Sequence, residues 1–473
     1  MSVANAKTCG IFCRQTGVFV RKEGIMNTDV LIVGSGCSGL YCALNLPSDR
    51  KITIITKSKA EESDSFLAQG GICVQRDDDD FDSFMEDTLK AGHYENNRES
   101  VGIMISSSRD VIDDLIAYGV RFNKDADGNL NYTREGGHSK KRILFHKDIT
   151  GREITSKLLE RVKKLPNVEI LEYTTMVDLI THAENETRIN FDGSEKKGEC
   201  FGAVVKLPDG TFDTIYADCT VLATGGVGGL YRHSTNFPHL TGDGVAVALR
   251  YGVATKDVDY VQIHPTTFYQ EEKGSRSFLI SESVRGEGAK LYDKNMERFV
   301  DELIPRDKLT EAIHKQMAKD GTSHVWEDMR TIPDEDLLSH FPNIIEYCRK
   351  NGYDPVKECI PVVPAQHYFM GGVEVDSNSQ TSMKRLYAIG ETACNGVHGK
   401  NRLASNSLLE SLVFAKRAAH DLEKYDTKPG IEIDLSPAND IKPNYRKYAD
   451  LDKWNKENYD LVLKEINRRR EDV

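Results

Sequence analysis

The stretch VLIVGSGCSGLYCALNL, residues 30–46, constrains the fold of this chain more than any other. Its first four residues are all apolar, which predicts a strand buried on both faces, as in a parallel sheet covered by helices. Beyond the glycine turn, apolar residues recur at helical spacing. We therefore predict a strand, a tight turn and a helix that open a doubly wound α/β domain.

The turn carries the spacing GxGxxG at Gly34, Gly36 and Gly39. The first glycine permits the turn, the second lets a pyrophosphate approach the backbone, and the third packs the helix on the sheet. The alternative is a glycine turn without a ligand. The acid that binds a ribose about 20 residues later in NAD proteins is missing, since residues 56–58 read TKS. A dinucleotide other than NAD, or another ribose contact, is therefore favoured.

Composition restricts the class of protein. A length of 473 residues suggests two to four domains, and a net charge of −12 argues against a nucleic-acid partner. The ten cysteines form no CxxC pair, so we expect free thiols, a reducing compartment such as the cytoplasm, and no metal site. No apolar run reaches the ~18 residues of a membrane span. Residues 1–25 are interpreted as an extension before a start at Met26, with a transit-type segment as the alternative.

Separated motifs occur in a specific order along residues 28–425. They are GSGCSG at 34, FLAQGGI at 66, TREGGHS at 133, ATGG at 223, TGDGVAVA at 241, QIHPT at 262, RGEGA at 285, PRD at 305, PVVPAQHYFMGGV at 361, AIGE at 388 and HGKNRLASNSLLE at 398. In this order they resemble the succinate dehydrogenase/fumarate reductase flavoprotein superfamily, and most closely its L-aspartate oxidase branch.

The resemblance implies an α/β fold: a discontinuous, Rossmann-like FAD-binding domain with an inserted α+β capping domain and a short C-terminal helical tail. The expected spans are an extension at 1–25, the FAD-binding domain at 26–257 and 366–428, the capping domain at 258–365, and the tail at 429–473. In the tail, Tyr459, Leu463 and Ile466 suggest one amphipathic helix. The tail is shorter than the family's usual helical domain.

The resemblance also implies a set of FAD contacts. Many relatives tether FAD through a histidine just before AQGG, whereas this chain has Asp64 there and no histidine nearby, so we predict noncovalent FAD. The expected contacts are Gly34, Ser35, Gly36, Cys37, Ser38, Gly39, Lys57, Asp64, Ser65, Phe66, Leu67, Ala68, Gln69, Gly70, Gly71, Val177, Asp243, Glu391, Ser407 and Leu408. For Asp243 and Glu391 the alternative is an acid that caps a turn or helix.

Oxidation of a dicarboxylate requires that both carboxylates be held and that one group handle a proton. By resemblance, His264, Ser281, His367 and Arg402 hold the carboxylates, although each histidine taken alone could be a hydrogen-bonded core residue. Arg306 resembles the proton-transfer arginine, which suits a proton donor better than an acceptor; its alternative is a helix-start arginine paired with Asp307 or Glu311. Arg285 is expected to pair with Glu282 or Glu287.

Glu135 lies among basic residues, namely Arg134, His138, Lys140, Lys141 and Arg142. A substrate with two carboxylates and an ammonium would need both basic groups and one buried acid, because an unpaired ammonium out of water is costly. L-Aspartate has this pattern, whereas succinate and fumarate lack the cation. Glu135 is therefore the predicted discriminator, and the alternative is a loop acid paired with Arg134 or Arg142. Lys140 and Lys141 could equally form a solvated rim.

The resemblance thus implies FAD-dependent oxidation of L-aspartate to iminoaspartate. The reduced cofactor would be reoxidised by O2, giving H2O2, or by fumarate, giving succinate. In the family this step begins NAD synthesis through quinolinate, with quinolinate synthase as the downstream partner. The alternatives are a soluble fumarate reductase or succinate dehydrogenase flavosubunit, and a flavoprotein without turnover.

Overall fold

The computed structural model describes residues 11–12, 19–20, 26–189, 195–271, 276–425 and 444–471. Its largest sheet contains the parallel strands predicted from the opening motif. In spatial order these are β18 (Leu386–Ala388), β11 (Phe212–Leu222), β3 (Met26–Val33), β4 (Ile52–Ile55) and β8 (Val168–Leu171). The late strand β18 pairs with β11, so the sheet domain is discontinuous in sequence, as expected.

Antiparallel strands extend this sheet at β11. They are β10 (Glu195–Lys206), which pairs with β11, and β9 (Thr175–Ile189), which pairs with β10. Two short strands, β1 (Ile11–Phe12) and β2 (Phe19–Val20), also join this sheet. The rest of the expected extension at 1–25 lies outside the described residues.

Helices cover one face of the parallel strands and bury a large core with residues such as Leu40, Ile54, Leu158 and Leu412. The covering helices are α1 (Cys37–Asn45), α3 (Phe81–Ala91), α4 (Arg98–Ser106), α5 (Ser108–Ala117), α6 (Thr150–Val162) and α12 (Asn406–Leu422). The opposite face packs against β9, β10 and α7 (Asp243–Arg250). Both faces are therefore covered, which explains the unbroken apolar pattern of the strands.

Short elements connect these layers near the ends of the parallel strands. One is the helix α2 (Asp64–Leu67). Two small sheets are formed by β5 (Ile72–Cys73), β7 (Ile143–Leu144) and β6 (Tyr132–Thr133), and by β12 (Thr255–Lys256), β17 (Gly372–Glu374) and β19 (Ala393–Cys394). The 3-10 turns are η1 (Asp78–Asp80), η2 (Gly228–Leu230) and η3 (Gly390–Thr392).

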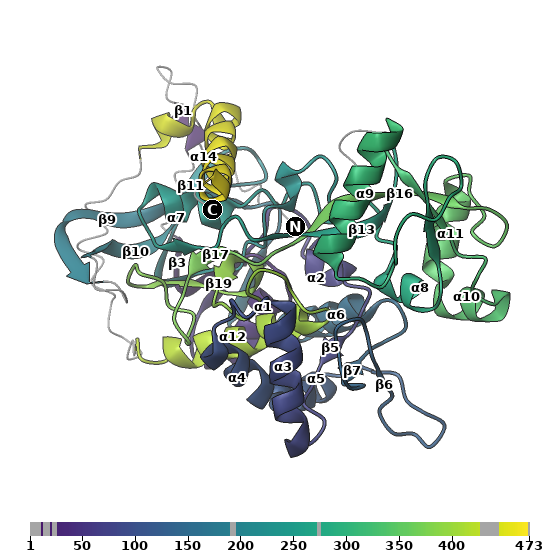
Figure 1. Cartoon of the computed structure of the whole chain (residues 1–473). Helices are drawn as coiled ribbons and strands as arrows, with labels where there is room; N and C mark the ends of the chain where they lie inside the picture. The colour runs from purple at the N-terminus through teal and green to yellow at the C-terminus, as the bar shows by residue number, and fades with distance from the viewer. Residues whose placement is uncertain are drawn as a thin grey trace, which may run out of the picture.

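A second unit, green in Figure 1, is inserted between these elements and has its own core, which includes Phe268, Leu309 and Ile344. It is an antiparallel sheet in the order β13 (Val261–Phe268), β16 (Ile360–Phe369), β15 (Val325–Asp328) and β14 (Lys290–Tyr292). Its helices are α8 (Glu282–Gly286), α9 (Arg306–Asp320), α10 (Asp334–His340) and α11 (Pro342–Lys350). The sheet extends to Phe369, beyond the expected boundary at 365, because Phe369 still pairs with Val261.

The tail contains η4 (Tyr445–Tyr448) and α14 (Leu451–Glu471), which lies beside α7 (Figure 1). The helix was expected, but its most buried residues are Val462 and Ile466, while Tyr459 and Leu463 are only half-buried. The apolar stripe is shifted because α14 packs along α7 at Val245 and Ala246. Among the described helices, none is long and apolar enough to cross a membrane.

Candidate active site

A cavity lies at the carboxyl ends of β3, β4 and β11 and continues to the inserted unit. This is the place where doubly wound sheets bind ligands. Its lining includes most of the residues predicted from the sequence: Gly34, Ser35, Gly36, Ser38, Lys57, Asp64, Ser65, Leu67, Ala68, Gln69, Gly70, Gly71, Glu135, Asp243, His264, Ser281, Arg306, His367, Glu391, Arg402, Ser407 and Leu408.

The glycine turn has the geometry that a pyrophosphate requires. Gly34 has φ +121°, and a Cβ there would lie 2.0 Å from the Ala223 carbonyl oxygen. A Cβ on Gly39 would lie 2.2 Å from the Gly34 carbonyl oxygen, so Gly39 packs α1 against the turn. Gly36 precedes α1, and the Cys37 amide in the first turn donates to Ser65 Oγ at 3.2 Å. Gly36 and Ser38 line the cavity, so the positive end of α1 faces it, as an anion site requires.

Four predicted cofactor residues do not line the cavity: Cys37, Gly39, Phe66 and Val177. The Cys37 thiol is buried in the core, where burial raises its pKa to about 11. The Phe66 ring lies beside the Arg152 guanidinium. Val177 packs on the far side of β9, and its neighbour Met176 lines the cavity instead, since side chains alternate along a strand.

Lys57 stands where NAD proteins have an acid, and it pairs with Asp243. Its Nζ lies 2.5 Å from Asp243 Oδ2 and also donates to the carbonyl oxygen of His239 and to Thr241 Oγ1. Asp243 begins α7 but makes no cap hydrogen bond; its Oδ1 accepts from Thr241 Oγ1 at 2.8 Å, and the residue lines the cavity. The pair places one ammonium and one carboxylate at this end of the cavity.

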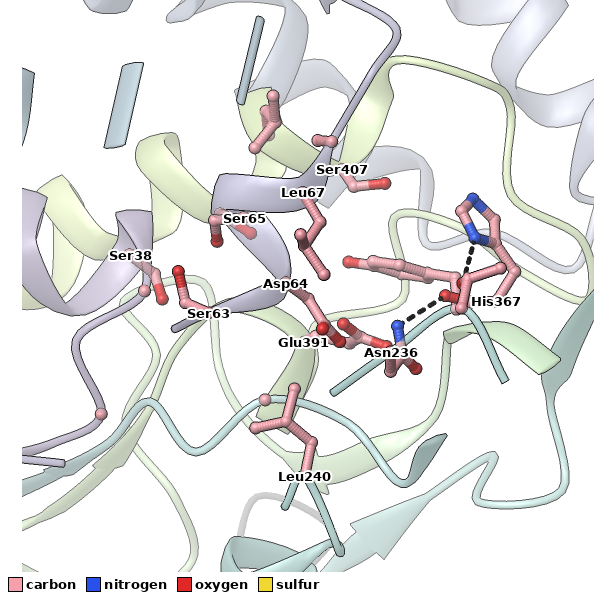
Figure 2. Close-up of a pocket in the computed structure, with 18 of the residues that line it drawn as sticks. Ser38, Ser63, Asp64, Ser65, Leu67, Asn236, Leu240, His367, Glu391 and Ser407 are labelled. Atoms are coloured by element: carbon pink, nitrogen blue, oxygen red, sulfur yellow. Dashed lines mark hydrogen bonds between the residues drawn. The ribbon is translucent and has the colours of Figure 1, made fainter. Parts of the chain in front are cut away.

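Two half-buried carboxylates, Asp64 and Glu391, face one another in the cavity (Figure 2). Asp64 Oδ1 accepts from the Phe237 amide at 2.9 Å, and Glu391 Oε1 accepts from the Phe369 amide at 2.8 Å. Burial raises the pKa of both groups, and the mutual repulsion raises the pKa of Glu391 further. Arg276 opposes the rise in the pKa of Asp64.

Several buried polar atoms in this region lack a hydrogen-bond partner within the described residues. They are Ser63 Oγ, Asp64 Oδ2, Gln69 Oε1 and Asn236 Oδ1. Buried polar groups are normally satisfied, so a polar ligand is expected here. The glycine cradle, the N-terminus of α1 and these groups together fit an FAD molecule, with Glu391 or Asp64 able to accept from ribityl hydroxyls.

The cap-side end of the cavity holds two arginines. Arg306 Nε donates to Glu282 Oε2 at 2.6 Å, so Arg306 pairs with Glu282 and not with the expected Asp307 or Glu311. Burial by itself raises the pKa of Glu282, but the two nearby arginines, Arg306 and Arg285, outweigh it and hold this pKa below its ordinary value. Burial, followed by repulsion from Arg306, lowers the pKa of Arg402 to about 10.

Arg285 was expected to pair with Glu282 or Glu287. Its Nη1 donates to the Glu302 carbonyl oxygen, and its guanidinium is attracted electrostatically by the Glu282 carboxylate. Glu287 instead pairs with His340. Arg285 is buried behind the cavity wall and does not line it.

The two histidines lie together, with ring centroids 5.4 Å apart. His264 Nδ1 contacts the Thr266 backbone, and His367 Nδ1 contacts Thr235 Oγ1 at 2.8 Å (Figure 2). Burial, followed by the neighbouring arginines, lowers the pKa of both imidazoles, so they are neutral. Both are hydrogen-bonded, as core histidines would be, and both also line the cavity.

Glu135 points into the same cavity. Its Oε2 accepts from Ser405 Oγ at 2.6 Å, and a Cβ on Gly70 would lie 2.9 Å from its Oε1. Burial raises the pKa of Glu135, and the Glu282 carboxylate raises it further, while the Ser405 hydrogen bond and the charges of Arg306 and Arg402 lower it. The alternative pairing with Arg134 or Arg142 is therefore wrong.

The basic residues around Glu135 do not form the anion site. Arg142 is fully buried and binds Asp80 and Asp87, with Nη1 against His138 Nδ1 at 3.1 Å. His138 Nε2 lies 2.9 Å from the Ala404 carbonyl oxygen. Lys140 and Lys141 are exposed. This network supports the loop that carries Glu135, and the cations that act on Glu135 from within the cavity are Arg306 and Arg402.

Sequence reasoning missed several cavity residues, and most had no local signal. Ser405 and Thr235 act through partners far away in sequence. Glu282 directly follows the predicted Ser281, so its position beside a site residue could have indicated that it lines the cavity. Other lining residues not predicted include Ser63, Thr174, Met176, Thr224, Asn236, His239, Arg276, Tyr368 and Ser411.

Comparisons with known proteins agree with this geometry. A family model described as an FAD binding domain matches residues 29–408. The chain is 47% identical to the L-aspartate oxidase of Clostridium perfringens over 445 residues, covering 94% of this chain and 95% of that protein. It is 49% identical to the L-aspartate oxidase of Clostridium acetobutylicum over 397 residues, covering 84% and 88%.

Solved structures of related flavoproteins share the fold. A quinol-fumarate reductase with menaquinol molecules superposes with a TM-score of 0.78 at 29% identity, covering 90% of this chain and 79% of that one. An E. coli quinol fumarate reductase superposes with a TM-score of 0.76 at 29% identity, covering 88% and 74%. Together with the curated relatives, these matches establish that the chain belongs to the L-aspartate oxidase family of FAD-binding flavoproteins.

Proposed function

We propose that the protein oxidises L-aspartate to iminoaspartate, the first step of NAD synthesis through quinolinate. The observation that carries the proposal is a half-buried carboxylate, Glu135, that lines a cavity together with Arg306 and Arg402. A ligand with two carboxylates and one ammonium satisfies this arrangement, because each buried charge then has a partner of opposite sign.

The substrate carboxylates are held by Arg402, the two histidines and Ser281. A guanidinium offers a planar pair of donors that matches a carboxylate. When Thr235 donates its hydroxyl proton to His367 Nδ1, the Nε2–H of His367 becomes the donor on the cavity side. Ser281 caps the N-terminus of α8: its Oγ accepts from the Ser283 amide, and its hydroxyl, which donates to Ser283 Oγ at 3.3 Å, can turn toward a substrate carboxylate.

Glu135 binds the ammonium and is held by Ser405. Ser405 has φ +64°, an unfavourable conformation for a serine, and its Oγ also accepts from the Gly71 amide. The hydroxyl therefore connects the AQGG loop with Glu135, and the carboxylate is oriented before substrate arrives.

FAD, when bound, supplies the acceptor for the hydride that leaves the substrate Cα. Arg306 holds the exchangeable proton: its Nε donates to Glu282 and its Nη1 to Gln262, which orients the guanidinium. In the reverse sense, when fumarate is reduced, Arg306 gives a proton to the substrate carbon. Glu282 stabilises the cation until then.

We propose that the inserted unit, at 258–365, is a cap that closes the cavity over the substrate. It contributes His264, Ser281, Glu282 and Arg306, while Glu135 and Arg402 come from the other unit. Closure therefore completes the site and excludes water from an imine that hydrolyses readily.

The electron acceptor is proposed to be O2 or fumarate, and the partner enzyme quinolinate synthase, which consumes the unstable product. A cytoplasmic location is proposed as well. It is supported by the eight cysteines of the described residues, which are free thiols, because a reducing compartment keeps them so.

Anaerobic titration of the yellow holoenzyme tests the proposal. L-Aspartate should bleach the flavin absorption band, and a control amino acid such as L-alanine should not. Bleaching by succinate alone would indicate a succinate dehydrogenase or fumarate reductase subunit. The absence of bleaching with either ligand would indicate a flavoprotein without this turnover.

A further inference from the structure

Gln262 on β13 is buried, at 4% exposure, and contacts both arginines of the site without lining the cavity itself. Its Oε1 accepts from Arg306 Nη1 at 3.1 Å and from Arg402 Nε at 3.2 Å. Arg306 belongs to the inserted unit and Arg402 to the sheet domain. One neutral oxygen thus joins two cations that come from different units of the fold.

The orientation of the Gln262 amide follows from its other contacts. Nε2 donates to Asn401 Oδ1 at 2.8 Å and to the Arg402 carbonyl oxygen at 2.9 Å. Asn401 Nδ2 in turn donates to the Ala91 carbonyl oxygen, which leaves Asn401 Oδ1 as the acceptor. A flipped Gln262 would direct NH2 donors at two guanidiniums, which have no acceptors. The oxygen must therefore face the arginines.

We propose that Gln262 is a positioning residue that sets the spacing of Arg306 and Arg402 and so the fit of a four-carbon dicarboxylate. The inference rests on the proposed function. The two guanidiniums repel each other, and a shared acceptor keeps them at a constant separation. Because this acceptor is neutral, it cancels neither charge, and both cations stay available to the substrate.

The neutrality of Gln262 distinguishes it from Glu282 and Glu135, the acids of the same site. A carboxylate at 262 would keep an oxygen between the arginines but would add a negative charge beside both. It would also lose the donors to Asn401 and to the Arg402 carbonyl oxygen. The affinity for a dicarboxylate therefore depends on the charge of the side chain at position 262. The separation of the two arginines depends on the oxygen of that side chain.

The test compares Gln262→Glu, Gln262→Leu and Gln316→Leu with the wild-type holoenzyme. Gln316 is a buried glutamine on α9 whose amide binds Asp293 and Asp320, so it controls for the loss of a buried amide in the same unit. The readouts are FAD content, melting temperature, succinate Kd from the flavin spectrum, and kcat and KM for L-aspartate.

Gln262→Glu should raise the succinate Kd and the KM for L-aspartate roughly tenfold or more, with kcat changed by less than about tenfold. Gln262→Leu should lower kcat as well, by roughly tenfold to a hundredfold, because the arginines then move apart. Gln316→Leu should lower the melting temperature only. If Gln262→Leu loses FAD, the near-isosteric Gln262→Glu still decides the question.

Succinate binding by Gln262→Glu at the wild-type Kd would overturn the proposal, and so would wild-type kcat and KM in a folded Gln262→Leu. These outcomes count against the role of Gln262 only if L-aspartate bleaches the flavin absorption band of the wild-type enzyme. If L-aspartate does not bleach the flavin of the wild type, the proposed function itself is refuted, so the two failures are distinguishable.

Discussion

The substitution Glu135→Gln tests the choice between an amino acid and a plain dicarboxylate. It keeps the size of the side chain and an oxygen that can accept from Ser405 at the observed 2.6 Å, but it removes the charge that receives the substrate ammonium. An unpaired buried charged group costs about 1–3 kcal/mol, so kcat/KM for L-aspartate should fall by roughly 5-fold to 150-fold. Fumarate carries no ammonium, and its reduction should be unchanged or faster.

The assay measures both reactions on the same preparations, with aerobic L-aspartate oxidation in one and fumarate reduction by a reduced viologen dye in the other. Glu311→Gln, an exposed acid on α9 paired with Lys315, is the matched control and should change both rates little. Equal losses of the two activities in Glu135→Gln would refute the reasoning, because a scaffolding residue affects both alike.

The pH dependence provides an independent check on Glu135. Burial raises the pKa of this carboxyl, and the ionised form is the one that binds an ammonium. The value of kcat/KM for L-aspartate should therefore decrease as pH falls through the raised pKa, and this limb should be missing from Glu135→Gln. Succinate binding should not weaken along the same limb.

Three further substitutions test other parts of the molecule. Arg306→Leu should retain FAD and lose both activities by at least about a hundredfold, and surviving turnover in a stopped-flow assay would remove its role as proton donor. Gly34→Ala should lower FAD content and melting temperature, because φ +121° and the Ala223 carbonyl oxygen 2.0 Å away leave no room for a methyl group; Gly286→Ala, which faces open space, is its control. Glu327→Gln should stabilise the protein at pH 9 by about 3–5 kcal/mol and little at pH 4.5. Burial raises the pKa of Glu327 from 4.5 to about 8. Between these two pH values the folded state keeps a proton that the unfolded state has lost, so the stability of the wild type falls as pH rises. Equal shifts of the melting temperature at pH 4.5 and pH 9 would contradict this.

Much of the fold was predictable because its signals are local. The apolar strand, the GxGxxG turn and the helix follow one another within residues 30–46, and each is specified by its own residues. The family motifs then supplied the order of the elements and most of the cavity residues. Cys37, Phe66 and Val177, predicted as cofactor contacts, do not line the cavity, because the direction of a side chain depends on what packs against it.

The sequence by itself thus determined the dinucleotide cradle, the discontinuous sheet domain and the residue types of the site. Tertiary structure decided the partners: Glu135 with Ser405, Arg306 with Glu282, and Arg142 with Asp80 and Asp87. The physical reason is distance along the chain. A turn is specified by neighbouring residues, whereas a buried charge takes whichever opposite charge or hydroxyl the folded layers bring within hydrogen-bonding reach.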